Sequence, residues 1–273
     1  MRTDTRMICA LSLLWLVIAG HAAEPGPEVS VTGGKIRGIQ PSSRGGAVFK
    51  GIPFAQPPVG ELRWREPVPV RPWRGIRDAT GFGHTCVQGG ALGADSSEDC
   101  LYLNVWAPEW PAKSRKAVMV WIHGGGNFAG AGSEPVFDGE SLARHGVVVV
   151  TMNYRLGIFR FFAHPELTKE SPHHVSGYYG LLDQVLALRW VHENIASFGG
   201  DPGNVTMFGE SAGSLDVNVL MTSPLSQGLF CRAIGESGPV VAPPPLAEGE
   251  GLRRNVCDLY SEKVKRESGK QTD

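Results

Sequence analysis

One serine stands in a pattern that supports nucleophilic chemistry. Ser211 is the central residue of Gly-x-Ser-x-Gly over residues 209–213. A short apolar run, 205–208, precedes the pattern and a helix-forming run, 215–221, follows it, which predicts a strand, a sharp turn and a helix with the serine at the apex. Gly209 and Gly213 remove side chains where strand and helix crowd together. We therefore expect Ser211 to be a nucleophile, with the Ala212 amide facing the oxygen of an attacked carbonyl group.

A second segment, His123-Gly124-Gly125-Gly126, follows directly on the apolar run 118–122. Three consecutive glycines weaken regular structure, but they allow backbone amides to approach a ligand closely. A flexible turn is the alternative interpretation of this segment alone. The order of the two motifs along the chain is that of lipases and esterases, in which such a loop supplies donors to an oxyanion. Loss of one such donor typically costs on the order of 3 kcal/mol.

The elements that must position these motifs can be read from hydrophobic periodicity. Strand and helix alternate from about position 117 onward, which predicts an α/β fold with a parallel sheet. Antiparallel strands ahead of that point would make the sheet mixed, and an amphipathic pattern over 252–264 predicts one further helix. The predicted strands are 29–39 (a hairpin), 48–55, 101–106, 118–122, 147–152, 205–208 and 232–235, and the predicted helices are 138–145 and 180–195.

Composition excludes some classes of partner. The chain has 273 residues, a hydrophobic fraction of 42% and a charged fraction of 19%, which are ordinary values for one large globular domain. Its net charge of -1 provides no field that would gather nucleic acid. We therefore expect neither a nucleic-acid partner nor binding to an anionic membrane surface.

The N-terminus has the pattern of a targeting segment. Arg2 and Arg6 precede the apolar stretch 7–20, and small residues follow at 19–23. The stretch is shorter than the roughly 20 residues that span a bilayer, so we expect no membrane anchor. We predict a signal peptide over 1–23, a secreted or periplasmic protein, and a mature domain over 24–273.

The cysteines fit such an oxidising compartment. Cys86 and Cys100 bracket a loop rich in Gly, Ala and Ser, and we predict a local bridge between them. In the chain-entropy model such a loop stabilises by roughly 3 kcal/mol. Cys9 lies in the predicted signal peptide, and Cys231 and Cys257 are either buried thiols or a second bridge. No spacing resembles a metal site.

Several motifs together resemble the type-B carboxylesterases, which include cholinesterase-like proteins. The motifs stand in family order at 49–55, 98–106, 153–157, 180–184 and 198–213, and the resemblance covers roughly residues 29–240. It implies an α/β-hydrolase fold with a mixed, mostly parallel sheet flanked by helices. It also implies hydrolysis of small-molecule carboxylic esters through a serine acyl-enzyme, without a cofactor. In the resemblance Ser211 is the nucleophile, Gly125, Gly126 and the Ala212 amide form the oxyanion hole, and Cys86–Cys100 is the family's first disulfide.

The resemblance also shows what is missing. In this fold the triad runs Ser, then Asp or Glu, then His along the chain, but all eight histidines precede Ser211. Glu248 and Glu250 lack the family's acid motif, so we predict neither a triad acid nor a triad His in this chain. The family usually has about twice this length, so we expect an N-terminal portion whose C-terminal part is missing. We expect His123 to brace the glycine loop and His173-His174 to be solvated, rather than to act as substitute bases.

Other positions depart from the family pattern. Arg160 stands where the family usually has glycine, and we expect a bulky cation there to strain the packing. Tyr178 replaces the usual asparagine, and Gly235 and Pro239 depart from the pattern around them. Glu210 matches the family, and we expect it to shape the turn at Ser211 by hydrogen bonds.

Three functional hypotheses follow from the sequence. The first is an ester hydrolase that lacks part of its triad in this chain and turns over little or no substrate. The second is a non-catalytic, cholinesterase-like binding module, and the third is one half of a split enzyme.

Overall fold

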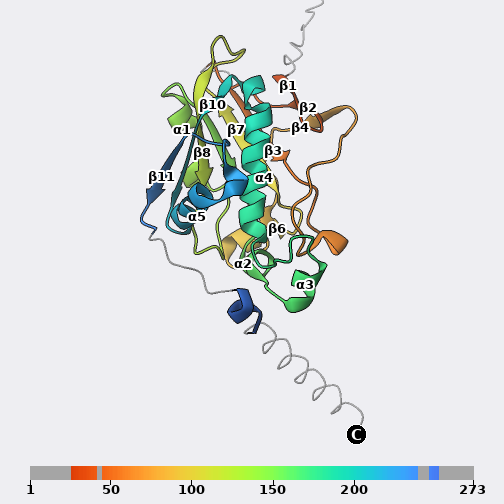
Figure 1. The fold of residues 1–273 in the computed structure, drawn as a ribbon. Helices are drawn as coiled ribbons and strands as arrows, with labels where there is room; N and C mark the ends of the chain where they lie inside the picture. The colour runs from red at the N-terminus through yellow and green to blue at the C-terminus, as the bar shows by residue number, and fades with distance from the viewer. Residues whose placement is uncertain (1–25, 42–44, 239–245, 252–273) are drawn as a thin grey trace, which may run out of the picture.

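A computed structural model describes residues 26–41, 45–238 and 246–251 of the chain (Figure 1). Its centre is a six-stranded sheet in the order β11-β10-β8-β9-β7-β3. The strands β8, β9, β10 and β11 are parallel to one another, whereas β7 and β3 pair in antiparallel fashion. The predicted α/β fold with a mixed, mostly parallel sheet is confirmed. The strands are β3 (Ala47–Pro53), β7 (Tyr102–Ala107), β8 (Lys116–Ile122), β9 (Val148–Met152), β10 (Gly200–Glu210) and β11 (Arg232–Glu236).

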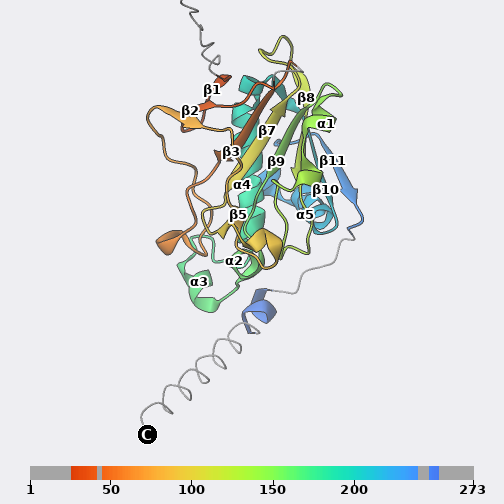
Figure 2. The ribbon, with the colours of Figure 1, turned by 180° about the vertical axis from the view of Figure 1, so that it is seen from behind.

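Helices cover both faces of this sheet. On the face toward the viewer in Figure 1 lie α4 (Tyr179–Asn194) and α5 (Ala212–Thr222), and α1 (Glu140–Ala143) lies on the opposite face, seen in Figure 2. Strand β9 is buried along its whole length, as expected for a continuous apolar run between two layers. The main core includes residues of β8, β9, β10 and α4, while a smaller cluster of Trp106, Ala143 and Val149 lies under α1.

The predicted hairpin forms, but it does not join the main sheet. Strands β1 (Glu28–Val31) and β2 (Gly34–Arg37) pair in antiparallel fashion around Gly33, and β2 also pairs with β4 (Ile76–Asp78). These three short strands make a separate sheet. The remaining elements are β5 (Thr85–Cys86), β6 (Ser96–Ser97), α2 (Gly157–Phe161), α3 (Pro165–Glu170) and 3₁₀ turns at Gly60–Leu62, Ala91–Gly93, Pro135–Phe137, Ile195–Phe198 and Pro224–Ser226.

Some predictions fall outside the described residues. These are the signal peptide over 1–23, the helix over 252–264, and the state of Cys257. Cys231, in contrast, is among the described residues. It is an exposed free thiol, so the expectation that it is buried or bridged is wrong. Its Sγ precedes strand β11 and lies 3.3 Å from the Val205 carbonyl oxygen.

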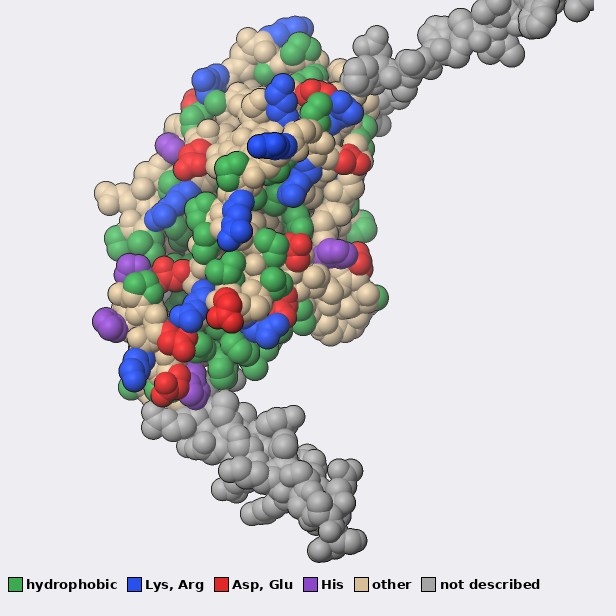
Figure 3. Space-filling view, turned by 90° about the vertical axis from the view of Figure 1, so that its right-hand side faces the viewer, with side chains coloured by type: hydrophobic (Ala, Val, Ile, Leu, Met, Phe, Trp, Pro, Cys, Tyr) green, Lys and Arg blue, Asp and Glu red, His purple; other side chains and the backbone are tan. Residues whose placement is uncertain are grey.

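Charged side chains of both signs lie on one face of the described part of the chain. On the face drawn in Figure 3, acidic and basic side chains alternate with apolar ones. Among the helices of the described part of the chain, none is long and apolar enough to cross a bilayer.

Candidate active site

The pairing of two strands brings the two sequence motifs together. Strands β8 and β10 are adjacent and parallel, and their register places Gly209 opposite Ile122. The residues after each strand therefore leave the sheet side by side at its carboxyl edge, where ligands bind in open α/β sheets. Those residues are His123 and Gly124 on one side and Ser211 on the other. Sheet register alone thus creates the meeting of the glycine loop and the serine.

Ser211 stands on a strained turn between β10 and α5. Its backbone angles are φ 54° and ψ −119°, an unusual conformation for a residue with a side chain. The Ser211 amide donates a 2.8 Å hydrogen bond to the Glu236 carbonyl oxygen of β11, which helps to hold the turn. The serine is half-buried and immediately precedes α5, so it stands between strand and helix as the sequence predicts.

The two glycines of the motif are needed for close packing. A Cβ on Gly213 would lie 2.1 Å from the Ile122 carbonyl oxygen, and one on Gly209 would lie 2.7 Å from the Gly213 carbonyl carbon. Neither distance is compatible with a side chain, so α5 can approach β8 and β10 this closely only with glycine at both positions.

The glycine loop passes beside Ser211. A Cβ on Gly124 would lie only 3.2 Å from the Ser211 Cβ, so the loop backbone passes directly beside the serine. Gly125 and Gly126 have φ values of 97° and 65°, a left-handed conformation that glycine adopts without strain. Within the described part of the chain, the amides of Gly125, Gly126 and Ala212 donate no hydrogen bond. They are therefore available to a developing oxyanion.

His123 braces the loop as predicted. The ring is 1% exposed, its Nδ1 lies 2.9 Å from the Gly124 carbonyl oxygen, and it stacks on Tyr154 with ring centroids 4.3 Å apart. Burial lowers the pKa of His123 to about 4, opposed by the Gly124 hydrogen bond and assisted by the charge of Arg160. The ring is therefore neutral at pH 7, with Nδ1 as the donor to Gly124.

The depressed pKa of His123 makes stability depend on pH in a defined direction. The folded-state pKa of about 4 lies below the ordinary 6.5, so the unfolded chain takes up the proton first and the folded state loses stability as pH falls through this window. Between pH 7 and pH 5 we expect the free energy of unfolding of the wild type to fall by about 2 kcal/mol more than that of His123→Gln, because glutamine does not titrate. Urea unfolding of both proteins at the two pH values measures the difference, and parallel losses would contradict it.

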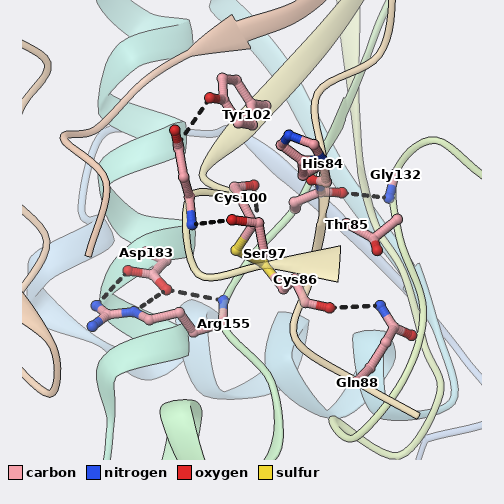
Figure 4. The surroundings of a disulfide bond; sticks show 12 residues. His84, Thr85, Cys86, Gln88, Ser97, Cys100, Tyr102, Gly132, Arg155 and Asp183 are labelled. Carbon is pink, nitrogen blue, oxygen red and sulfur yellow. Dashed lines mark hydrogen bonds and ion pairs between the residues drawn. A yellow bond between two sulfur atoms is a disulfide. The ribbon is translucent and has the colours of Figure 1, made fainter. Parts of the chain in front are cut away.

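The loop enclosed by the disulfide supports the far end of the glycine loop. Cys86 and Cys100 form the predicted bridge, with an S–S distance of 2.06 Å. Gln88, two residues beyond Cys86, donates to the Cys86 carbonyl oxygen (Figure 4). Its side chain also exchanges two hydrogen bonds, of 2.8 and 3.0 Å, with the backbone of Gly130. The bridge thus holds a residue that fixes the point where the glycine loop rejoins the fold.

Arg160 has a buried charge partner, which was not predicted from the sequence, and the expectation that the arginine strains the packing stays a prediction. Arg160 and Asp216 are both fully buried, and Nη2 of the arginine lies 2.5 Å from Oδ1 of the aspartate. The guanidinium also lies over the rings of Tyr154 and Phe161 at 5.0 and 4.7 Å. Gly180 of α4 makes the space, because a Cβ there would lie 2.7 Å from the Arg160 Cγ. The pairing is incomplete, since Nε and Nη1 of Arg160 have no acceptor in the described part of the chain.

The Ser211 side chain has no partner for proton transfer among the residues that the structure describes. Within the described residues no histidine or carboxylate forms a hydrogen bond with its side chain. His173 and His174 are exposed as predicted, and the Glu250 carboxylate accepts a hydrogen bond from Thr168 beside α3. Glu210 is exposed and its side chain forms no hydrogen bond with another described residue, so its role at the turn stays a prediction.

Three residues that surround the glycine loop escaped the sequence reasoning. They are Asn127, Tyr154 and Asp216, and all three are buried. A signal for Asp216 was present, because an acidic residue in the apolar stretch 215–221 needs a buried partner. The side chain of Asn127 is polar and follows the last glycine directly, but nothing local identifies its partner.

Comparisons with known proteins agree with this geometry. The model of the carboxylesterase family matches residues 25–272. The fumonisin B1 esterase of Sphingopyxis macrogoltabida is 47% identical over 239 residues, 85% of this chain and 44% of that protein. The para-nitrobenzyl esterase of Bacillus subtilis (strain 168) is 50% identical over 213 residues, 75% of this chain and 42% of that protein.

Solved structures of esterases are also similar to this chain over less than half of their own length. A carboxylesterase of Geobacillus stearothermophilus superimposes with a TM-score of 0.76 at 43% identity, covering 85% of this chain and 47% of that one. A thermophilic PNB esterase gives a TM-score of 0.76 at 45% identity, covering 83% and 47%. The chain thus spans less than half the length of these relatives. Fold, motif geometry and similarity over nearly the whole sequence agree: the chain belongs to the carboxylesterase family.

Proposed function

We propose that this site is built for hydrolysis of small-molecule carboxylic esters through an acyl-enzyme on Ser211. The observation that carries the proposal is the free Gly125, Gly126 and Ala212 amides beside a serine on a strained turn. The serine oxygen attacks the ester carbonyl carbon, and the amides stabilise the negative oxygen of the tetrahedral intermediate. The alcohol leaves with the serine's proton, and water then releases the carboxylic acid and restores the serine.

Among the described residues no side chain is placed to serve as the base for those proton transfers. A serine hydroxyl is a poor nucleophile until a base removes its proton, and His123 is buried, neutral and occupied with Gly124. Sites that lose a triad member keep a residual acceleration of about 10³ to 10⁴-fold over water, from the oxyanion hole and binding. We therefore propose slow acylation and slower release for the 273-residue chain.

Acylation of Ser211 tests the chemistry directly. The pure chain is incubated with p-nitrophenyl butyrate at pH 8.5 and its intact mass is followed over hours, beside Ser211→Ala. We expect one butyryl group to accumulate on the wild type at Ser211 and none at that position in the variant. Equal modification of the two proteins would contradict the assignment of the nucleophile.

Two alternatives make different predictions. A non-catalytic binding module needs no reactive serine, so it predicts capture of a specific partner by Ser211→Ala as well as by the wild type, and no acylation. A split enzyme predicts steady ester turnover only after this chain is mixed with a downstream fragment. The free oxyanion amides favour an enzymatic origin over the binding module, because binding alone gives no reason to leave three amides unpaired beside a strained serine.

For localisation we propose export, supported by the pattern of residues 1–23 and by the Cys86–Cys100 bridge. N-terminal sequencing of the mature protein recovered from outside the cytoplasm would find the cleavage site near residue 23. Recovery of the uncleaved chain from the cytoplasm alone would contradict export.

A further inference from the structure

Two anchors flank the three glycines of the oxyanion loop. At one end the Tyr154 hydroxyl donates a 2.5 Å hydrogen bond to the His123 carbonyl oxygen. Burial, together with the charge of Asp216, raises the pKa of Tyr154, so this hydroxyl stays protonated and remains a donor. At the other end Asn127 follows Gly126, is 5% exposed and has a left-handed φ of 62°. Only the three glycines at 124–126 lie between these anchored residues, His123 and Asn127.

Asn127 connects the loop to the helix that carries the serine. Its Nδ2 donates to the Asp216 Oδ1 across 3.3 Å, and Asp216 lies on α5, which starts immediately after Ser211. The Asn127 carbonyl oxygen also accepts a 2.8 Å hydrogen bond from the Gly157 amide. The Asn127 side chain is therefore a direct link between the segment that holds the Gly125 and Gly126 amides and the helix that begins with Ala212.

The Asp216 carboxylate is itself fixed from two other directions. Arg160 donates to Oδ1 from α2 at 2.5 Å, and Gln184 donates to Oδ2 from α4 at 2.6 Å. A buried carboxylate with three donors has one arrangement that satisfies it, so it cannot drift without leaving polar groups unpaired. The position of Asp216 thus sets the position of Asn127.

We propose that Asn127 and Asp216, with Arg160 behind them, are positioning residues that set the distance between the loop amides and the Ser211 turn. The inference rests on the proposed function. Oxyanion donors act only when aimed at the place where charge develops, and a displacement of about 1 Å can lower a rate about 100-fold. Asn127 touches no reacting atom, so its loss should slow acylation while leaving substrate binding unchanged.

The test compares single-turnover acylation of Ser211 in the 273-residue wild type, N127G and Q184M. Glycine at 127 removes the side chain and tolerates the left-handed backbone. Methionine at 184 removes the donor to Oδ2 but leaves Oδ1 of Asp216 bound to Arg160 and Asn127, so it controls for the loss of one buried hydrogen bond while the link from Asn127 to α5 is kept. We expect N127G to lower the limiting acylation rate tenfold or more, with an unchanged half-saturating ester concentration and an unchanged acylated fraction. We expect Q184M to stay within about threefold of wild type.

Two further measurements separate positioning from folding. R160M/D216L removes the acceptor of Asn127 without leaving a buried charge, and it should slow acylation as N127G does. Hydrogen exchange of the amides at 124–130 should be faster in N127G than in wild type or Q184M. Acylation of N127G at the wild-type rate would overturn the inference.

Failure of the proposed function would look different. A wild-type chain that is acylated no faster than S211A contradicts the nucleophile itself. Hydrogen exchange then decides the structural part: equal exchange at 124–130 in N127G and wild type overturns the link, and faster exchange in N127G supports it.

Discussion

Asp216→Leu should destabilise the folded chain by about 3–5 kcal/mol, because it leaves the Arg160 guanidinium buried without its charge partner. Both side chains have no exposed surface, and two nitrogens of Arg160 already have no acceptor within the described residues. Burial raises the pKa of Asp216, while Arg160 and the hydrogen bonds from Gln184 and Asn127 favour the carboxylate. Each charged side chain of the pair therefore depends on the other to offset the cost of its burial.

The matched control is the double variant R160M/D216L. Replacing a buried ion pair by apolar residues of similar volume is often neutral or stabilising, but here the Asn127 and Gln184 amides also lose their acceptor. We therefore expect the free energy of unfolding of the double variant to lie below that of wild type but about 2 kcal/mol above that of D216L. Urea unfolding of the wild type, D216L and R160M/D216L measures all three. If D216L and the double variant were destabilised equally, the loss would come from shape and not from the unpaired charge, and the account of Arg160 would fail.

Gly213→Ala should destabilise the chain by about 3 kcal/mol, the upper part of the range for overpacked sites. In an open helix the same change stabilises, because alanine is the better helix former by about 1 kcal/mol. Here the new Cβ would lie 2.1 Å from the Ile122 carbonyl oxygen, a backbone atom that cannot rotate away. Helix α5 would have to move off the sheet and take the Ser211 turn with it.

Gly89→Ala is the control for this change, since a Cβ there meets nothing within 4 Å and its φ is not left-handed. We expect the free energy of unfolding of Gly89→Ala to lie within about 0.5 kcal/mol of the wild-type value. Thermal or urea unfolding of both variants gives the comparison. A stabilised G213A would mean that α5 does not pack against β8 as closely as described.

The sequence was sufficient for those features that depend on local pattern. Buried runs such as 118–122 and 147–152 predicted the strands, and the glycines at 209 and 213 predicted the tight crossing of strand and helix. The meeting of the glycine loop with Ser211 was implied by the family resemblance; the adjacency of β8 and β10, which brings it about, came from the structure.

Features that depend on distant partners were not predictable in the same way. The hairpin at 28–37 was found from its alternation, but short strands do not reveal which sheet they join. The environment of Arg160 depends on Asp216, 56 residues away along the chain. Its effect could not be judged from side-chain volume alone, because a buried cation is tolerated or not according to its partner.

We propose that Ser211 is a nucleophile to which no described residue supplies a base. Release of p-nitrophenol from p-nitrophenyl butyrate by the wild type and S211A, followed well beyond one equivalent per chain, tests it most directly. We expect the wild type to release about one equivalent slowly and then to continue at the rate of S211A, because an acyl-enzyme without a base is not hydrolysed efficiently. Many turnovers that depend on Ser211 would contradict this account and would require a base among the residues of this chain.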